Sequence, residues 1–369
     1  MPKTRRSIRD DRLFANPFVA GVSPYRTATH PLLDLATAVR LDGNEEVTPP
    51  SARAVMAAAE AAAGARLYPD PATHGLKATI STAFGIEEAA ILCGHGSEEL
   101  IFLMCRALLS PGDEVVMPAS TFSIFRIATA MTGAQVVRVP ERRFVADVDA
   151  LLNAVTPRTR IVALANPNNP TGTWIPSAEV WRLRRSLPDD VVLMLDAAYA
   201  DYVGDDDYSP GDELVRTGLT LVLRTFSKAH ALAGLRVGWA HAPEAIAELW
   251  SRVKPVFNLS APAEAAAAAS LADTARLAAV RAQAARAAAD YQALWDGLGL
   301  DSVQGAVNFS FVSLPDGQGE GLHDALARAN ILTTRLMGYD LPDALRISFG
   351  SAEENARVAA AVRGWAEVR

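Results

Sequence analysis

Short apolar runs rich in β-branched residues alternate with longer amphipathic stretches through the middle of the chain. The runs have the length of buried strands, whereas the stretches between them repeat apolar positions every three or four residues. Such alternation predicts a mainly parallel sheet covered by helices on both faces, an α/β fold of three layers. The predicted strands are Glu114–Met117, Gln135–Val139, Arg160–Ala165, Val191–Asp196, Thr220–Arg224 and Val237–His241. The predicted helices are Ser97–Leu109, Ser123–Thr132, Ser177–Ser186 and Glu244–Val253.

The pattern changes after Ala261, where a long Ala- and Arg-rich helical tract runs to about Trp295. A strand, a helix, a strand and a helix follow, which predicts a second, smaller α+β unit. We assign residues 1–49 to an N-terminal arm and part of the small domain, 50–254 to the large domain, and 255–369 to an interdomain helix and the small C-terminal domain. The four later elements are Asn308–Leu314, Gly321–Ala329, Leu345–Phe349 and Glu353–Trp365.

Composition places the chain among globular proteins and argues against nucleic acid and membranes as its partners. With 369 residues, 50% hydrophobic and 21% charged, it is long enough to bury a large core. The net charge of −7 argues against nucleic acid as a partner. The most apolar late stretch contains Glu264 and is rich in Ala, so no membrane span is expected.

The two cysteines, Cys93 and Cys105, lie in apolar surroundings without the spacing of a zinc site or a disulfide framework. We expect buried thiols, no metal and a reducing compartment. Arg5-Arg6 is followed by acidic residues and by no apolar run, so an export signal is not expected. These features predict a cytoplasmic protein, in which the basic stretch Lys3–Arg12 forms a partly ordered arm.

Ligands of open α/β sheets bind beyond the carboxyl ends of the strands, and polar residues follow four predicted strands there. Asn166–Gly172 forms a Pro- and Asn-rich turn, and Asp196 ends a strand three residues before Tyr199. A hydroxyl-flanked lysine stands in Thr225–Lys228, and a glycine turn at Gly94–Glu99 opens a helix. Together they offer an anion cradle, an amine, a carboxylate, an amide and a phenol. Pyridoxal 5′-phosphate needs this set, so we infer it as the cofactor.

These segments, in this order, resemble the fold type I pyridoxal-phosphate-dependent aminotransferases of the histidinol-phosphate aminotransferase group. The resemblance covers roughly Leu41 to the C-terminus and implies the family's large α/β domain, its small domain and its transfer of an amino group between an amino donor and a 2-oxo acid. The segments that carry the resemblance are Leu67–Pro71, Gly94–Leu100, Asn166–Gly172, Asp196–Tyr199, Arg224–Ala229, Ala233–Gly238, Pro255–Asn258 and Leu345–Ser348.

The resemblance implies a catalytic role for three residues. Lys228 is expected to form the Schiff base with the cofactor and, once freed, to move the proton between the substrate Cα and the cofactor. Asp196 is expected to pair with the pyridinium nitrogen and so to make the ring an electron sink. Tyr199, together with Asn169, is expected to donate to the phenolate oxygen of the ring.

Further residues are expected to bind the cofactor by resemblance. Phe122 stands where relatives commonly carry a stacking Tyr. Tyr68 resembles a tyrosine that reaches the phosphate of a neighbouring subunit, which implies a homodimer with shared active sites. The phosphate and its surroundings are assigned to Gly96, Ser97, Glu98, Thr225, Ser227 and Arg236.

Substrate binding is expected at Arg346, which resembles the arginine that grips the anionic group of the substrate, with Asn44 and Asn169 beside it. The family pattern suggests a second arginine shortly before Arg346. Ungapped counting puts Thr334 there and Arg335 one place later, so we include Arg335 as a substrate-binding residue. Histidinol phosphate, an aromatic amino acid and another amino acid of specialised metabolism all remain open as substrates.

Three functions are compatible with the motifs. The leading hypothesis is an aminotransferase that uses a Lys228 Schiff base. The second is a pyridoxal-phosphate-dependent decarboxylase, eliminase or cyclase, because cofactor motifs do not decide which bond at Cα breaks. The third is a non-catalytic binding protein on the same fold, which the presence of Lys228, Asp196 and Arg236 disfavours.

Overall fold

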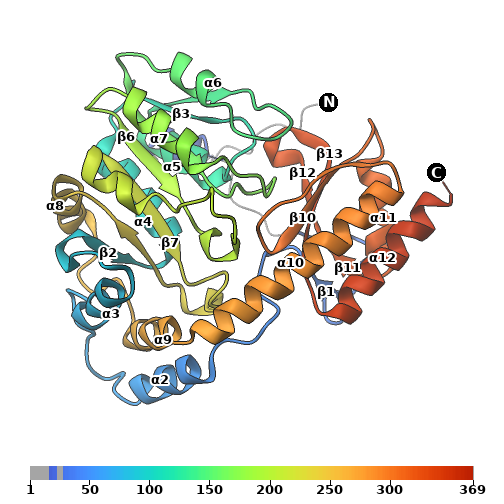
Figure 1. Cartoon of the computed structure of the whole chain (residues 1–369), viewed down its shortest axis with the longest axis horizontal. Helices are drawn as coiled ribbons and strands as arrows, with labels where there is room; N and C mark the ends of the chain where they lie inside the picture. Colours follow the sequence, from blue (N-terminus) through green and yellow to red (C-terminus); the bar gives the residue numbers. More distant parts are fainter. Residues whose placement is uncertain (1–15, 23–27, 369) are drawn as a thin grey trace, which may run out of the picture.

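The computed structural model describes residues 16–22 and 28–368, so the segments Lys3–Arg12 and Arg5-Arg6 lie outside the described residues. The described chain forms two bodies, and the long helix α10 (Thr274–Gly297) reaches from the larger to the smaller (Figure 1). Within the described residues, no helix is long and apolar enough to cross a bilayer.

A seven-stranded sheet forms the centre of the larger body, in the order β2-β8-β7-β6-β5-β3-β4. Its strands are parallel except β8, which runs antiparallel to both β2 and β7. The predicted α/β class with a mainly parallel sheet is therefore confirmed. The strands are β2 (Ile91–Gly94), β3 (Glu114–Pro118), β4 (Gln135–Val139), β5 (Thr159–Ala165), β6 (Val192–Asp196), β7 (Thr220–Thr225) and β8 (Gly238–His241).

Helices cover both faces of this sheet, which explains why β5, β6 and β7 read as continuous apolar runs. One layer packs through a cluster that includes Leu100, Phe125 and Trp250, and the other through a cluster that includes Leu151 and Leu183. The first layer contains α4 (Gly96–Leu108), α5 (Ser123–Thr132) and α8 (Glu244–Val253). The second contains α6 (Val148–Asn153) and α7 (Ser177–Ser186).

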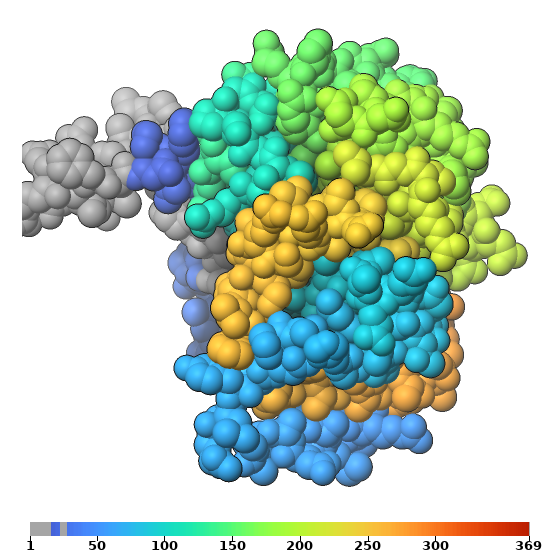
Figure 2. All heavy atoms as spheres, turned by 90° about the vertical axis from the view of Figure 1, so that its left-hand side faces the viewer, coloured from blue at the N-terminus to red at the C-terminus, as the bar shows by residue number. Residues whose placement is uncertain are grey.

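The predicted helical tract from Ala261 to Trp295 is two helices, because the chain breaks between α9 (Ala261–Leu271) and α10. Helix α9 packs against α2 (Ala52–Ala62) and α3 (His74–Phe84) in the larger body, through small and apolar side chains. Figure 1 shows these three helices together, and Figure 2 shows the face of the larger body on which α2 and α3 lie. The boundary of the larger body therefore follows α9 and does not lie at residue 254 as assigned from the sequence.

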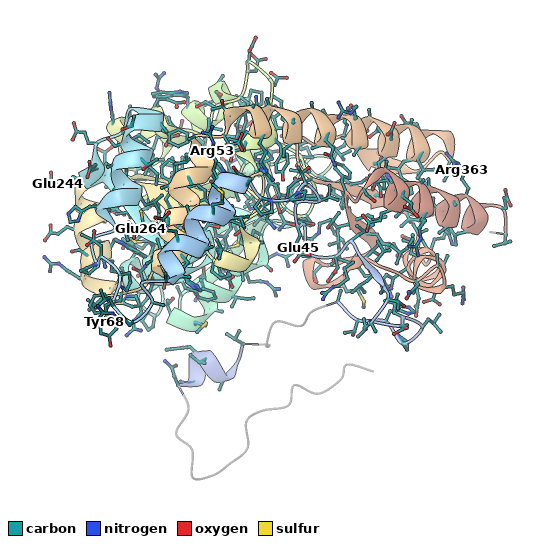
Figure 3. All side chains as sticks on the ribbon, turned by 90° about the horizontal axis from the view of Figure 1, so that it is seen from below. Glu45, Arg53, Tyr68, Glu244, Glu264 and Arg363 are labelled. Atoms are coloured by element: carbon teal, nitrogen blue, oxygen red, sulfur yellow. The ribbon has the colours of Figure 1, made fainter. Side chains whose placement is uncertain are left out.

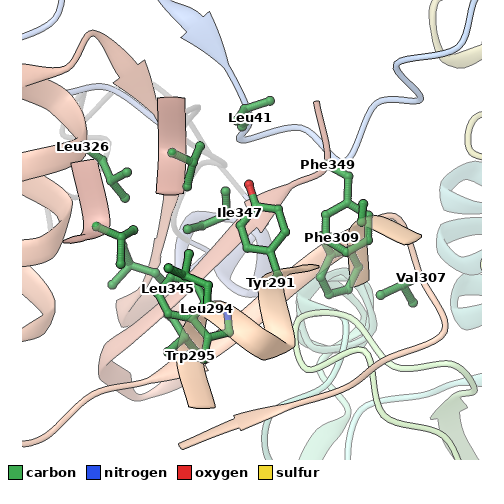
Figure 4. Close-up of a cluster of buried hydrophobic side chains, with 14 of the residues drawn as sticks. Leu41, Tyr291, Leu294, Trp295, Val307, Phe309, Leu326, Leu345, Ile347 and Phe349 are labelled. Atoms are coloured by element: carbon green, nitrogen blue, oxygen red, sulfur yellow. The ribbon is translucent and has the colours of Figure 1, made fainter. Parts of the chain in front are cut away.

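The smaller body is a four-stranded antiparallel sheet, β12-β13-β10-β9, with helices packed against it. Its core includes Trp295, Phe309 and Ile347, and Leu41 joins it from the N-terminal segment (Figure 4). The elements are β9 (Asp301–Val303), β10 (Phe309–Ser313), α11 (Gly319–Arg328), β12 (Thr334–Leu336), β13 (Leu341–Ser348) and α12 (Ala352–Ala366).

Two pieces of the N-terminal segment bind different bodies. Strand β1 (Val39–Arg40) pairs in parallel with β11 (Ile331–Leu332) of the smaller body. The short helix α1 (Pro17–Ala20) lies against α5, where a Cβ on Gly133 would come within 2.7 Å of the Phe18 ring. The N-terminal segment therefore spans both bodies, and its residues 41–46 pass between them.

Candidate active site

A cavity of about 420 Å³ lies beyond the carboxyl ends of β5, β6 and β7, at the side of the larger body that faces the smaller one. Most of the residues predicted for the site line it, from elements far apart in the sequence. These residues are Asn44, Ser97, Glu98, Phe122, Asn169, Asp196, Tyr199, Thr225, Ser227, Lys228, Arg236 and Arg346.

Lys228 follows the end of β7 in a tight turn that fixes its position. The Ala231 N–H donates to the Lys228 carbonyl at 2.8 Å, and Ala231 itself has φ +57°. The Arg276 guanidinium donates to the Ala229 carbonyl at 2.6 Å, and His230 is hydrogen-bonded to the Ser270 hydroxyl at 2.9 Å. Burial lowers the pKa of His230 to about 4, so this imidazole is neutral and holds the turn.

The Lys228 amine reaches across to the N-terminal segment. Its Nζ donates to the Asn44 carbonyl at 3.0 Å and to the Gly43 carbonyl at 3.3 Å. Burial, together with the nearby Arg346 and Arg236 cations, lowers the pKa of Lys228 to about 7. A large part of the amine is therefore neutral and nucleophilic at neutral pH.

Asp196 ends β6 and is buried, with the Lys228 amine among its charged neighbours. Its Oδ1 accepts the Ala198 N–H at 2.9 Å. Burial raises the pKa of Asp196 to about 6, although the Ala198 N–H and the Lys228 cation oppose this change. The carboxylate is thus mostly charged at pH 7, and among the described residues its hydrogen bond is to the Ala198 N–H and not to a cation. A cation that enters the cavity, such as a protonated ring nitrogen, would find its counter-charge here.

Tyr199 and Asn169 each present a donor to the cavity, because their acceptor atoms are already used. The Asn44 amide donates to the Tyr199 hydroxyl oxygen at 2.9 Å, and Arg346 donates to Asn169 Oδ1 at 2.6 Å. Burial raises the pKa of Tyr199 well above its usual range, so the phenol keeps its proton. Asn44 has φ +51°, a left-handed conformation that Asn tolerates better than most residues.

One end of the cavity is built for an anion. The Arg236 guanidinium donates to the Ser227 hydroxyl at 3.3 Å and lies beside the first turn of α4. A Cβ on Gly96 would come within 2.7 Å of Arg236 Nη2, and a Cβ on Gly238 within 2.6 Å of the Ser97 nitrogen. Only glycine allows both approaches. Free N–H groups of a helix start, hydroxyls and a guanidinium in one place suit a phosphate.

Arg346 on β13 forms the opposite wall and belongs to the smaller body. Its Nη1 donates to Asn169 Oδ1 and its Nη2 to the Asp42 carbonyl at 2.7 Å. Its Nε is buried and has no partner in the described part of the chain. An unpartnered N–H on a buried guanidinium that lines a cavity is a candidate contact for an anionic substrate group.

Three predicted site residues do not line this cavity: Gly96, which lies against the lining residue Arg236, and Arg335 and Tyr68, which lie away from it. Arg335 donates to the Pro342 carbonyl at 3.1 Å and lies 3.9 Å from Glu320, on the other face of β12 from Thr334. The expectation that Arg335 binds substrate was wrong, because neighbouring residues on a strand face opposite sides. Tyr68 is 81% exposed, stacks on Phe257 and projects from the edge of the larger body, far from the labelled Glu45 between the bodies (Figure 3).

Among the lining residues that were not predicted for the site are Asp42, Ile124 and Tyr339. Tyr339 comes from the smaller body, and two arginines of the larger body hold its segment. Arg126 donates to the Gly338 carbonyl at 3.2 Å, and Arg138 pairs with Asp340. No sequence motif predicts that Tyr339 lines the cavity, because its position there depends on how the two bodies pack.

The comparisons with known proteins agree with this geometry. The family model of the class I and II aminotransferases matches residues 30–362, and the chain belongs to this family. It is 40% identical over 352 residues to a histidinol-phosphate aminotransferase of Granulibacter bethesdensis, covering 95% of each chain. It is 42% identical over 356 residues to that of Paramagnetospirillum magneticum, covering 94% of this chain and 97% of the relative.

A solved structure is similar over the whole chain. The histidinol-phosphate aminotransferase of Sinorhizobium meliloti, in complex with pyridoxal 5′-phosphate, has a TM-score of 0.88 and 27% identity, and 98% of this chain and 99% of that one are covered. The resemblance to fold type I aminotransferases is therefore confirmed. The chain is a pyridoxal-phosphate-dependent aminotransferase of the histidinol-phosphate aminotransferase-like group. The buried amine, the strand-end carboxylate and the glycine-lined anion cradle fit the cofactor.

Proposed function

We propose that this enzyme moves an amino group between an amino donor, whose anionic group Arg346 binds, and a 2-oxo acid acceptor that occupies the same place. When bound, pyridoxal 5′-phosphate supplies an aldehyde carbon that accepts the amine and a ring that withdraws electrons from the donor Cα. One observation carries the proposal. Lys228, whose pKa is about 7, lies in the same cavity as Arg346, a buried arginine whose Nε has no hydrogen-bond partner among the described residues.

Each site residue receives a role from its position. Lys228 would hold the cofactor and, in its neutral form, take the Cα proton of the donor and return it. Asp196 would hold a proton on the ring nitrogen, because the buried carboxylate gains from a cationic partner. Tyr199 and Asn169 would donate to the ring oxygen. Ser97, Ser227 and Arg236 would hold the phosphate, with Phe122 against the ring.

The donor class follows from what Arg346 binds. The relatives named above are histidinol-phosphate aminotransferases, which makes an amino phosphate one candidate donor. An amino acid, whose carboxylate would meet the same guanidinium, is the other. A cytoplasmic location is also part of the proposal, since Cys93 and Cys105 are both buried and free, as in reducing compartments.

We further propose a homodimer in which Tyr68 reaches the partner's phosphate site. Tyr68 and its neighbour Leu67 are exposed, as are Val256 and Phe257, with Tyr68 stacked on Phe257 at 4.4 Å between ring centroids. Exposed large apolar side chains that gather at one edge are typical of contact surfaces. Sedimentation of the purified protein at several concentrations tests the dimer. A Tyr68→Ala variant that sediments as wild type and binds the cofactor equally well would refute the shared site.

The visible spectrum of the loaded enzyme tests the reaction. We expect a yellow protein whose absorbance bleaches with one amino donor and recovers when a 2-oxo acid is added. A Lys228→Ala variant should stay unchanged under both additions, and Lys254→Ala, a lysine outside the cavity, serves as the control. Release of carbon dioxide or of an eliminated group without bleaching would instead favour the decarboxylase, eliminase or cyclase hypothesis.

A further inference from the structure

Ser348 ends β13, and its side chain points away from the core of the smaller body. Its neighbours Ile347 and Phe349 belong to that core (Figure 4). Because side chains alternate along a strand, Ser348 shares its face with Arg346, which lines the cavity. Ser348 is buried, so its hydroxyl forms its hydrogen bonds within the protein. The strand that carries Arg346 thus also carries a buried hydroxyl on the same face.

This hydroxyl fixes the orientation of the Asn44 side chain. The Asn44 main-chain N–H donates to Ser348 Oγ at 2.8 Å, so the oxygen of the hydroxyl accepts from the main chain. The one proton of the hydroxyl is donated to Asn44 Oδ1 at 3.2 Å. A carboxamide accepts only through its oxygen. The Asn44 side chain is therefore held with its oxygen toward Ser348 and its NH2 group on the other side.

The NH2 group of Asn44 faces Tyr199 and determines what the phenol can do. Asn44 Nδ2 donates to the Tyr199 hydroxyl oxygen at 2.9 Å. The phenol proton therefore points elsewhere, and Tyr199, which lines the cavity, can donate into it. If the carboxamide were reversed, Asn44 Oδ1 would face the phenol and accept its proton. Tyr199 would then present to the cavity an oxygen that accepts and does not donate.

The main chain around Asn44 is held independently of the Ser348 hydroxyl. The Asn44 carbonyl accepts from Asn308 Nδ2 at 3.1 Å and from Lys228 Nζ at 3.0 Å. The Ser348 main-chain N–H, which a side-chain substitution does not remove, donates to the Leu41 carbonyl at 2.9 Å. Loss of the hydroxyl would therefore free the Asn44 carboxamide to turn, while these contacts still hold the segment.

We propose that Ser348 is a positioning residue for Tyr199: its hydroxyl orients the Asn44 carboxamide, and the carboxamide directs the Tyr199 proton into the cavity, toward the ring oxygen of the cofactor. This inference rests on the donor role of Tyr199 in the proposed function. Burial raises the pKa of Tyr199, so the proton stays on the phenol. Because Ser348 belongs to the smaller body and Tyr199 to the larger one, the donor role of Tyr199 depends on how the two bodies pack.

The absorbance and the affinity of the cofactor depend on this proton, and neither needs turnover to be measured. A donor at the ring oxygen stabilises its negative charge, so losing the donor should raise the pKa of the bound cofactor that the visible absorbance follows. We expect this change in both Ser348→Ala and Tyr199→Phe, measured by spectrophotometric pH titration. Each substitution should also weaken cofactor binding about fivefold, the effect of one hydrogen bond, as measured by equilibrium dialysis.

A cycle of single and double substitutions separates positioning from a purely structural role. If Ser348 acts through Tyr199, Ser348→Ala has no further effect on the pKa or the affinity of the cofactor in a Tyr199→Phe background. Ser310→Ala is the matched control, because Ser310 is a buried serine of β10 that accepts from Trp295 Nε1 at 2.8 Å in the core of the smaller body. Its loss should leave both quantities as in wild type.

The inference is overturned if Ser348→Ala matches wild type in both quantities, or if its effect is undiminished in the Tyr199→Phe background. If Tyr199→Phe itself matches wild type, the donor role of Tyr199 fails as well, which distinguishes the two failures. Circular dichroism checks that Ser348→Ala folds. If it does not, Ser348→Cys, which keeps the shape of the side chain but hydrogen-bonds weakly, takes its place in the same measurements. If no amino donor bleaches the enzyme, amino transfer fails while these binding measurements still decide the role of Ser348.

Discussion

Replacing Lys228 by methionine should stabilise the cofactor-free enzyme, and more so at pH 7 than at pH 9. Burial and two arginines lower the pKa of this lysine from 10.5 to about 7. Because the folded-state pKa is the lower one, the unfolded chain binds a proton that the folded chain lacks between these values. The penalty is therefore complete below pH 7 and disappears as the pH rises toward 10.5.

The magnitude follows from the shift. Each pKa unit corresponds to about 1.4 kcal/mol, so two pH units inside the window change the free energy of unfolding of wild type by about 2 kcal/mol once partial titration at pH 7 is included. Methionine has a similar length and no charge. The gain in stability from Lys228→Met should thus be about 2 kcal/mol larger at pH 7 than at pH 9.

Urea unfolding of cofactor-free wild type and variant at both pH values, at one protein concentration, measures this double difference. Other groups titrate identically in wild type and variant, so their contributions to the unfolding free energy cancel in this double difference. Lys77→Met, on α3 and outside the catalytic cavity, is the matched control. If Lys228→Met gains the same stability at pH 7 as at pH 9, the lysine is not held neutral by its surroundings and the reasoning is refuted.

Two further predictions concern a buried arginine of the larger body and the turn that carries Asn169. Arg184→Met should lower the free energy of unfolding by about 3 kcal/mol, since the buried guanidinium donates to four main-chain carbonyls. Urea unfolding measures this loss, and the exposed Arg185→Met is the control. An equal or smaller loss of unfolding free energy in Arg184→Met than in Arg185→Met would contradict the prediction. Gly305→Ala should reduce kcat/KM about tenfold, because its Cβ would lie 2.7 Å from the Gly172 carbonyl in the turn that carries Asn169. Its control is Gly297→Ala, whose Cβ meets nothing within 4 Å, and equal donor kinetics in the two variants would show that this contact does not position Asn169.

The sequence by itself determined the sheet and the chemistry at its edge. Strand-length apolar runs, and Asp196 and Lys228 just beyond them, are local features, and the ends of parallel strands necessarily meet at one edge. For this reason the sequence could place Asp196 and Lys228 at one edge of the sheet without knowledge of the packing, and both line the same cavity. The break between α9 and α10 was missed because alanine-rich sequence is helical on either side of it.

Only the tertiary structure decided the substrate end. Whether Thr334 or Arg335 faces the cavity depends on the register of β12 against β13, and a shift of one residue exchanges the two sides. Tyr339 and Asp42 reach the cavity because the smaller body and the N-terminal segment meet the larger body there. Such long-range contacts leave no periodic signal in the sequence. The part of the cavity lined by Asp196 and Lys228 therefore follows from local pattern, whereas the part lined by Asp42, Tyr339 and Arg346 follows from how the two bodies pack.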